Sequence, residues 1–527
     1  MNLRAFRAPT VVALALLSLV AVGCTDTTVQ PKSTVTSANV FNDPSSYQAF
    51  IARVYSGLAV SGQQGPAGNP DIQGIDEGFS QYLRLYWECE ELPTDEAVIG
   101  WGDIGLPEMN TMTWTSSSTM VVAMYYRIYV QVVMANQFLN ETSTSALAGR
   151  AALSPALTTQ IQQYRAEARF LRALSYWHAI DLFGNAPLVK ETDPLGSTPP
   201  KQANRADIYN YVVAELTAIK DALPSSTAAN YGRATTQAAN MLLAELYLNA
   251  GVYTGTTAYP QALAAAQAVI SSGAYSLDPN YRHLFMADNN TSPEIIFAIT
   301  QDGKRTQSYG GVTFLAHAGC GGSIMSAGTY GIDYCWGGTR LKPEAYAFYT
   351  AGDKRSSYFF TNGQNVAVND ITNFNDGVAA PKFTNISSTG AQGSDPTFVD
   401  TDFPLFRLGE AYLIYAEAAL RTNANTAQAL TYVNQLRERA YGGASGDITS
   451  AQLTLPFILA ERGRELLWEA HRRTDLVRFA EFTGSAYIWS WKGGTKAGAS
   501  TDAHLNLYPL PGSELVANPN LTQNPGY

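Results

Sequence analysis

The sequence predicts a mainly α-helical protein: a tetratricopeptide-like helical-repeat scaffold of about four helix pairs, with a loop-rich irregular excursion that carries short strands. Three observations predict it. Apolar residues recur at helical spacing in long regions of the chain. Paired helical stretches repeat with small residues between them, as in tetratricopeptide units of about 34 residues. Elsewhere Gly, Asn, Asp, Ser and Thr interrupt the pattern, which is typical of turns and loops.

The helical repeats are predicted over about 40–60, 118–273 and 403–480. A helix over 157–182 should end at the Gly and Pro residues of the segment 183–187, because both residues stop helices. The paired stretches 234–250 and 259–271 form the clearest unit, with alanines where two helices must approach closely. The individual helices are expected at 47–60, 118–140, 157–182, 205–222, 234–250 and 259–271, and the paired scheme recurs over 412–440.

The remaining parts of the body, about 61–117 and 274–402, are predicted to be loop-rich and to bind the ligand. Long loops in compact proteins are usually functional or disordered. These segments also carry many of the chain's Trp and Tyr residues, whose flat, half-polar rings suit surfaces that hold sugars or partners. A large helical protein could alternatively use the same rings for packing.

Composition excludes several classes of protein. The 527 residues are 46% hydrophobic and 11% aromatic, which excludes disorder of the whole chain. Only 15% are charged, well below the roughly 25% of an average soluble chain. The net charge of -10, with no run of Lys or Arg, argues against a nucleic-acid-binding protein.

The N-terminus predicts an exported, lipid-anchored protein. Arg4 and Arg7 precede the apolar run 11–22, which is shorter than the roughly 20 residues of a membrane-spanning helix and indicates a signal peptide over 1–23. Ala21-Val22-Gly23-Cys24 resembles a lipobox, so Cys24 is the predicted lipidation site. Residues 24–37 form a polar tether and 38–527 the body. A chance cysteine after an ordinary signal peptide is the alternative.

The other cysteines are Cys89, Cys320 and Cys335. An exported protein permits disulfides, and Cys320 with Cys335, the closest pair in sequence, is the candidate. No CxxC motif or paired histidine accompanies them, so no metal site is expected. The segment 369–377 offers oxygen ligands but departs from EF-hand spacing, which leaves calcium as the one cofactor still open.

No HExxH, GxSxG or Walker motif is present, and we expect no enzyme activity. A glycosidase needs two carboxylates at a defined separation across the scissile bond. The acids of segment 88–96 are close together in sequence, and such acids more often face solvent. A helix over 461–478 should carry exposed ion pairs at i,i+3 and i,i+4 spacing, which are individually weak. The acids of segment 88–96 are Glu88, Glu90, Glu91, Asp95 and Glu96, and the helical pairs are Glu461–Arg464, Glu469–Arg472 and Glu469–Arg473.

Six motifs in order resemble the SusD/RagB family of outer-membrane nutrient-binding lipoproteins, which are starch-utilisation-system D-like proteins. They are the lipobox, YRAEARFLRALSYWHAIDLFGNAPLV (164–189), GRATTQAANMLLAELYLNAG (232–251), FRLGEAYLIYAEAALR (406–421), ILAERGRELLWEAHRRTDLVRF (458–479) and YPLPGSELVANPNLTQNPGY (508–527).

The resemblance implies a cell-surface lipoprotein, facing outward from the outer membrane, that binds oligosaccharides or polysaccharides. It also implies a partner, a SusC-like TonB-dependent transporter, to which the glycan is delivered. Three alternatives remain open: a peptide-capturing lipoprotein of the same import system, a secreted glycan hydrolase, and a structural tetratricopeptide adaptor.

Ligand-binding residues follow from the resemblance by position and from the chemistry of sugars. An exposed aromatic ring stacks on the apolar C–H face of a sugar, while Asn, Asp and Arg side chains bond its hydroxyls. Burial of Trp101 and Trp336 in loop cores is the alternative. The candidates are Trp101, Tyr330, Tyr334 and Trp336 for stacking, and Arg84, Asp103 and Asn110 as polar partners.

Overall fold

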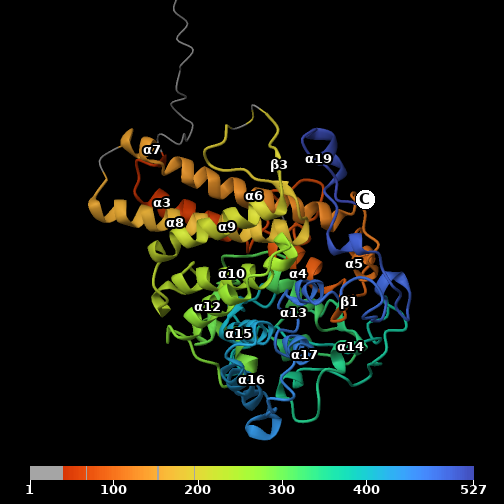
Figure 1. Ribbon diagram of the computed structural model, residues 1–527. Helices are drawn as coiled ribbons and strands as arrows, with labels where there is room; N and C mark the ends of the chain where they lie inside the picture. Colours follow the sequence, from red (N-terminus) through yellow and green to blue (C-terminus); the bar gives the residue numbers. More distant parts are fainter. Residues whose placement is uncertain (1–39, 67, 151–152, 195, 197) are drawn as a thin grey trace, which may run out of the picture. The chain divides into compact units, whose positions relative to one another are not determined.

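The computed structural model describes residues 40–527 except 67, 151–152, 195 and 197 (Figure 1). The chain divides after Ser46, and the fold below is that of the unit Tyr47–Tyr527. The predicted signal peptide, Cys24 and the tether lie outside the described residues. Within the described part, no helix is both long and apolar enough to cross a membrane.

The helical scaffold is confirmed, and its long helices pack in chain order. α6 packs on α8, α8 on α9, α10 on α12, α12 on α15, and α15 on α16, so that successive layers follow one another in Figure 1. The long helices are α3 (Ser45–Ser56), α6 (Thr119–Glu141), α8 (Pro155–Leu182), α9 (Arg205–Ile219), α10 (Thr236–Leu248), α12 (Tyr259–Ile270), α15 (Leu408–Thr422), α16 (Thr426–Tyr441) and α17 (Leu455–Glu465).

Local sequence sets the ends of these helices. The Ser154 side chain accepts a hydrogen bond from the Leu157 amide at the start of α8, with Pro155 in the first turn. The helix ends at Leu182, two residues before Gly184, which has a positive φ of 72°. Ala238 of α10 and Ala262 of α12 are fully buried, because small side chains let paired helices approach closely.

Four shorter helices that the sequence did not predict, α4, α5, α13 and α14, lie inside the segments expected to be loop-rich. All ten residues of α4 are buried, and so are all eight of α13. The charged face of α4 is buried as well, where Arg84 binds Glu88 at 2.8 Å. Helices this short, among turn-forming residues, leave no long helical period in the sequence. The short helices are α4 (Tyr82–Glu91), α5 (Leu106–Thr111), α7 (Thr144–Ala148), α11 (Ala250–Thr254), α13 (Gly311–Ala318), α14 (Pro343–Tyr346), α18 (Arg472–Arg478) and α19 (Gly512–Ala517).

Single 3₁₀ turns connect many of these helices. They are η1 (Lys220–Ala222), η2 (Ala228–Asn230), η3 (Tyr281–Phe285), η4 (Asn289–Thr291), η5 (Ala327–Tyr330), η6 (Lys354–Ser356), η7 (Ala444–Gly446), η8 (Lys492–Gly494) and η9 (Ala503–Asn506).

The short strands form antiparallel pairs. The pair β1–β5 has the greatest consequence, because it joins the two loop-rich segments at the register Val98–Arg340. The pair β4–β6 contains a register shift between Ile295 and Phe297. The strands are β1 (Ala97–Ile99), β2 (Ala186–Pro187), β3 (Gln202–Ala203), β4 (Ile295–Ile299), β5 (Thr339–Leu341) and β6 (Phe403–Arg407), paired as β1–β5, β2–β3 and β4–β6.

The segment predicted as one helix over 461–478 is two helices, and its ion pairs are buried. α17 ends at Glu465 and α18 begins at Arg472, because Trp468 and Ala470 between them have positive φ angles of 61° and 63°. Glu461 does pair with Arg464, at 2.7 Å. The other two predicted pairs are wrong: Glu469 binds Arg407 at 2.6 Å and Lys382 at 2.7 Å, Arg472 binds Asp95 at 2.6 Å, and Arg473 binds Asp181 at 2.7 Å.

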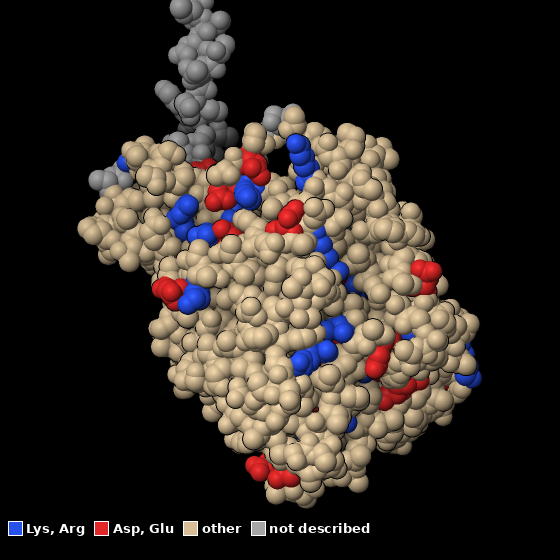
Figure 2. Space-filling view, viewed as in Figure 1, with Lys and Arg blue, Asp and Glu red and all other residues tan. Residues whose placement is uncertain are grey.

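The acids of segment 88–96 are also buried, and the expectation that they face solvent is wrong. Asp95 binds Arg472, and Glu90 lies 3.3 Å from Arg473. Their partners come from α18, at the opposite end of the chain, and only the fold brings these charges together. On the face drawn in Figure 2, the remaining basic and acidic side chains lie interspersed in small groups.

Candidate ligand-binding surface

The β1–β5 pair places Trp101 beside Trp336. Trp101 follows β1, Trp336 precedes β5, and the Gly100 amide donates to the Gly338 carbonyl at 3.0 Å. The ring centroids of the two tryptophans lie 6.3 Å apart. A Cβ atom at position 338 would lie 2.6 Å from Cζ2 of Trp101, so the indole can rest on this strand only because residue 338 is glycine.

A third ring, Tyr309, extends the row, and we call Trp101, Trp336 and Tyr309 the aromatic arc. The Tyr309 ring lies 6.3 Å from that of Trp336 and is 41% exposed. The Glu77 carboxylate accepts a hydrogen bond from the Tyr309 amide at 3.0 Å. Sequence reasoning missed Tyr309, and the only signal was its place before Gly310-Gly311, at the start of the unpredicted helix α13.

Trp336 is supported from below by His317. The two rings are stacked at 4.5 Å with an interplanar angle of 27°. The His317 ring nitrogens lie 2.6 Å from the Tyr334 carbonyl and 2.9 Å from the Thr397 carbonyl, which fixes the orientation of the imidazole. Burial is the largest effect on the pKa of His317 and lowers it. The support therefore consists of a well-packed ring with both nitrogens engaged.

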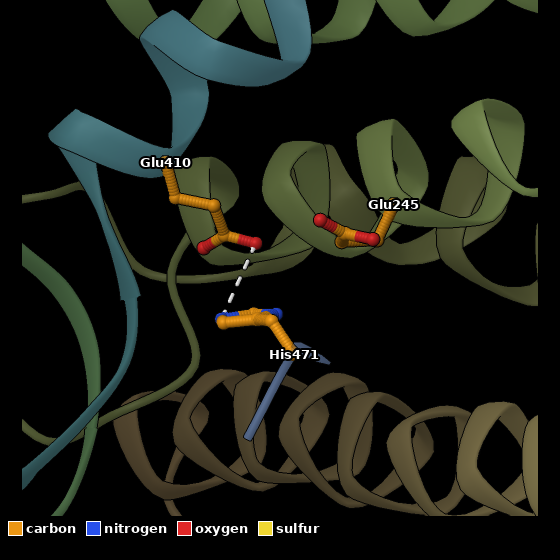
Figure 3. A group of neighbouring side chains, drawn as sticks. All are labelled: Glu245, Glu410 and His471. Atoms are coloured by element: carbon orange, nitrogen blue, oxygen red, sulfur yellow. Dashed lines mark ion pairs between the residues drawn. The ribbon is translucent and has the colours of Figure 1, made fainter. Parts of the chain in front are cut away.

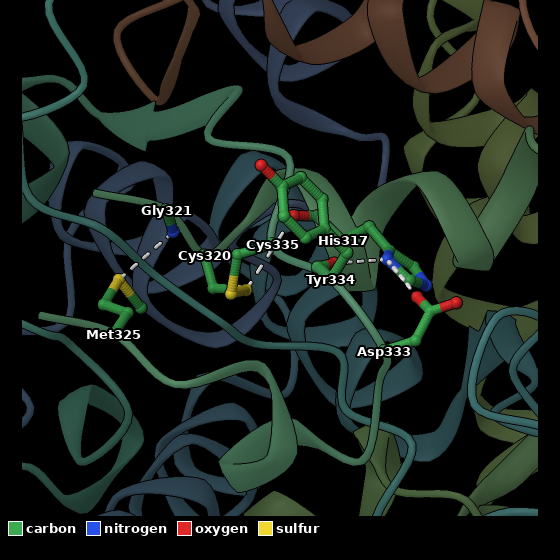
Figure 4. Close-up of a disulfide and its surroundings, with 7 residues drawn as sticks. All are labelled: His317, Cys320, Gly321, Met325, Asp333, Tyr334 and Cys335. Carbon is green, nitrogen blue, oxygen red and sulfur yellow. Dashed lines mark hydrogen bonds and ion pairs between the residues drawn. A yellow bond between two sulfur atoms is a disulfide. The ribbon is translucent and has the colours of Figure 1, made fainter. Parts of the chain in front are cut away.

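The predicted disulfide, Cys320–Cys335, is present next to Trp336 (Figure 4). It closes a loop with a sequence separation of 15. The Trp336 amide donates to the His317 carbonyl at 2.8 Å, which ties the end of this loop to α13. Cys89 is free and buried. The bridge thus limits the movement of the backbone that carries Trp336.

The other predicted aromatic residues differ in position. The Tyr334 side chain is 70% exposed, while its backbone carbonyl lies 2.6 Å from Nδ1 of His317 (Figure 4). Tyr330 lies apart from the arc: its carbonyl accepts from the Asn385 amide at 2.8 Å. Burial raises the pKa of Tyr330, and nearby Arg282 opposes that rise.

Two of the predicted polar partners are buried supports and do not face solvent. The Arg84 guanidinium lies over the Phe314 ring at 4.2 Å and the Trp101 ring at 5.7 Å, and its Nε donates to Glu88 at 2.8 Å. Asn110 is 1% exposed and bonds both the amide and the carbonyl of Ile99. Both residues were expected to bond sugar hydroxyls, but their burial and existing bonds place them beneath the surface instead.

Asp103 is exposed near Trp101, and a polar cavity provides further hydrogen-bonding groups. The cavity has a volume of about 860 Å³ and is lined by residues 63–64, 69–71 and 73–76. The last of these precedes Glu77, whose carboxylate accepts from the Tyr309 amide. Sequence reasoning singled out none of its side chains, since scattered amides and carboxylates in a loop form no motif. The polar residues that line it are Gln63, Gln64, Asn69, Asp71, Gln73 and Asp76.

The oxygen-rich segment 369–377, left open for calcium, surrounds a protein cation. The Arg340 guanidinium donates to the carbonyls of Ile371, Asn373 and Asp376. The Asp376 carboxylate accepts from the Asn369 amide at 2.9 Å. An arginine side chain therefore binds three of the backbone oxygens that this segment offers.

Two family models match the chain. One is described as the SusD family and matches residues 345–527, and the other, described as starch-binding associating with outer membrane, matches residues 95–248. The chain is 35% identical to the starch-binding protein SusD of Bacteroides thetaiotaomicron, over 91% of this chain and 92% of that protein. It is 26% identical to SusD-like protein P2 of Formosa agariphila, over 97% of this chain and 98% of that protein.

Solved structures share the fold. A SusD superfamily protein from Bacteroides thetaiotaomicron matches with a TM-score of 0.71 at 20% identity, covering 92% of this chain and 99% of that one. Surface glycan-binding protein A from the same organism, in complex with laminarihexaose, matches with a TM-score of 0.69 at 22% identity, covering 91% and 98%. From its sequence and its fold, the chain belongs to the SusD family.

Proposed function

We propose that this protein binds an oligosaccharide or polysaccharide on the aromatic arc, with a starch-type α-glucan as its ligand. The observation that carries the proposal is the arc itself: three rings from three separate loops, held side by side by β1–β5, α13 and the disulfide. The choice of glucan rests on the relative named as starch-binding, which is 35% identical over most of the chain.

The chemistry of the arc suits a sugar chain. A pyranose ring presents an apolar C–H face that packs on an indole or phenol ring, and successive sugars can use successive rings. Hydroxyls at the rim of the ligand need polar partners, which exposed Asp103 and the polar cavity of residues 63–76 supply. Tyr309 is 41% exposed and the two tryptophans are partly exposed, so the ligand would rest on the surface and could leave quickly, which a protein that hands on its ligand requires.

We propose binding without hydrolysis. A glycosidase needs two carboxylates about 5–10 Å apart that flank the scissile bond. The acids that the sequence offered for this role in segment 88–96 are buried, and several are bound to arginines of the scaffold, as in the Asp95–Arg472 pair. They support the fold and have no access to a glycan on the arc.

Anchoring at Cys24 and delivery to a SusC-like TonB-dependent transporter complete the proposal. The lipobox supports the anchor, and membership of the family supports an outer-membrane location facing the exterior. Replacement of Cys24 by Ala should move the protein from the membrane fraction to the soluble fraction. Co-purification of a TonB-dependent transporter with the anchored protein would support the partner, and purification without any would count against it.

Calorimetry on the chain from Thr25 onward tests the ligand. Maltoheptaose and amylopectin should give saturable heat without new reducing ends, whereas laminarihexaose should bind at least tenfold more weakly. If only laminarihexaose gives heat, the ligand is a β-glucan and the proposed α-glucan is wrong. Heat from a peptide mixture alone would favour the peptide-import alternative, and new reducing ends would show a hydrolase.

A further inference from the structure

Three buried side chains converge inside the helical scaffold, apart from the aromatic arc (Figure 3). They are Glu245 of α10, Glu410 of α15 and His471, the residue before α18. Glu245 is 1%, Glu410 0% and His471 5% exposed. One donor atom from each lies within 4.8 Å of the others.

The carboxylates of this cluster lack the partners that other buried acids have. Both oxygens of Glu410, and Oε1 of Glu245, have no hydrogen-bond partner among the described residues. The Glu410 Oε1 to His471 Nε2 distance of 3.8 Å is too long for a hydrogen bond. A buried carboxylate is unfavourable unless a proton or a cation compensates its charge, so this cluster needs one.

Nearby protein cations supply only part of that compensation, because other acids bind them more closely. Arg462 approaches Glu245 only to 3.7 Å, while its Nε binds Asp475 at 2.6 Å. Arg407, close to the start of α15, donates to Glu465 and Glu469. Neither arginine gives a hydrogen bond to the unpaired oxygens of Glu245 and Glu410.

We propose that Glu245, Glu410 and His471 bind a divalent transition-metal ion, with zinc as the first choice. One imidazole nitrogen and two carboxylate oxygens form a ligand set typical of zinc and its neighbours, whereas calcium and magnesium prefer oxygen alone. Two donors at about 2.0–2.2 Å from a tetrahedral zinc are about 3.3–3.6 Å apart. The Glu410–His471 distance of 3.8 Å is close to that spacing, and the widest spacing, up to 4.8 Å, has to shrink by on the order of 1 Å when the ion binds.

The protonation of the cluster agrees with this assignment. Burial lowers the pKa of His471, which keeps its imidazole neutral and able to coordinate. Burial and the neighbouring Glu245 raise the pKa of Glu410, the usual response of a carboxyl that lacks a counter-charge. A metal ion would displace any proton held there.

A bound ion would act as a structural cross-link. Its ligands come from three elements, α10, α15 and the turn between α17 and α18, which are distant in sequence. The sequence predicted no metal site for the same reason: the ligands share no motif. Among the described residues, no hydrogen bond, ion pair or ring contact joins the cluster to the arc, so the proposal is independent of glycan binding.

The test uses the chain from Thr25 onward, stripped with EDTA and then exposed to Zn²⁺, Mn²⁺ or Ca²⁺. After gel filtration, elemental analysis should find about one zinc per chain and no calcium, and zinc should raise Tm. Glu410→Gln and His471→Gln should lose the zinc and the rise in Tm. The matched control is His504→Gln, which removes a partly exposed histidine paired with Asp502 and should keep both the zinc and the rise in Tm.

A measurement on the unmodified chain covers the case in which the variants fail to fold. Cobalt should give the visible absorption of a site with nitrogen and oxygen ligands, and zinc should abolish it. No retained metal, with Tm unaffected by zinc and EDTA, would overturn the proposal and leave a proton shared between Glu245 and Glu410. If only His504→Gln loses the zinc, the ion binds at His504 and Asp502, and the proposal is wrong.

Discussion

Replacement of Trp336 by Ala tests the arc directly, because Trp336 is its central ring. The ring contacts Trp101 and Tyr309 at 6.3 Å each and stacks on His317 at 4.5 Å. An aromatic pair contributes about 0.5–1.5 kcal/mol, so the variant should lose about 1–3 kcal/mol of unfolding free energy. Truncation of an aromatic anchor at the centre of a binding surface costs at least about 2 kcal/mol of binding, or roughly 30-fold in Kd.

Two companion variants separate recognition from packing. Trp336→Phe keeps a ring over His317 and should recover most of the affinity. Tyr126→Ala removes a ring from α6 that contacts Tyr125 at 6.1 Å and Ser513 at 2.9 Å, so it should cost stability but no affinity. Calorimetry with maltoheptaose and urea unfolding measure the two effects. Affinity within twofold of the parent in folded Trp336→Ala would refute the arc as the binding surface.

The remaining predictions concern the arc's support and the buried charges. Gly338→Ala should reduce glucan affinity about tenfold by calorimetry, because the new Cβ would lie 2.6 Å from the Trp101 ring and displace it; unchanged affinity would mean that this ring is not part of the site. Cys335→Ser should lower the unfolding free energy by about 3 kcal/mol, as expected for a 15-residue loop; a parent protein insensitive to reductant in urea melts would contradict it. Burial lowers the pKa of His178 to about 3. The unfolded state therefore takes up a proton at a higher pH than the folded state does, and the unfolding free energy should fall as the pH drops from about 6.5 towards 3. Urea melts at pH 7 and 4 should show a loss on the order of 3 kcal/mol that His178→Gln lacks; equal losses in both proteins would exclude His178 as the cause. Arg407→Met leaves three buried carboxylates without this partner and should cost at least about 3–5 kcal/mol in thermal or urea unfolding; a melt within experimental error of the parent would show that the pairs contribute no net stability.

The scaffold was predictable wherever a helix has one buried and one exposed face. The bounds of α6 and α8 agree with the predictions over 118–140 and 157–182 to within two residues. The buried helices α4 and α13 escaped detection, because they are only ten and eight residues long and lie among turn-forming residues. The break between α17 and α18 escaped detection too, because positive φ angles at Trp468 and Ala470 interrupt an apparently continuous pattern.

The candidate site was predictable in its residue types but not in its geometry. Large aromatic residues in loops pointed to Trp101 and Trp336, and the family resemblance gave their approximate places. Tyr309 joins them only because α13 and Glu77 hold it there. Arg84 and Asn110 were expected to face a ligand, yet they lie beneath the arc, because exposure depends on packing that loop sequences do not encode locally.

The sequence by itself determined the helical repeats, the cysteine pair and the resemblance to a family, because each of these depends on residue types at short spacings along the chain. The export signal stays a prediction from the sequence. Only the tertiary structure decided which charges are buried and which rings meet. Asp95 and its partner Arg472 are 377 residues apart, and Trp101 meets Trp336 through a strand pair of three residues on each side. Contacts between distant segments depend on how the whole chain packs, and no local pattern records that packing.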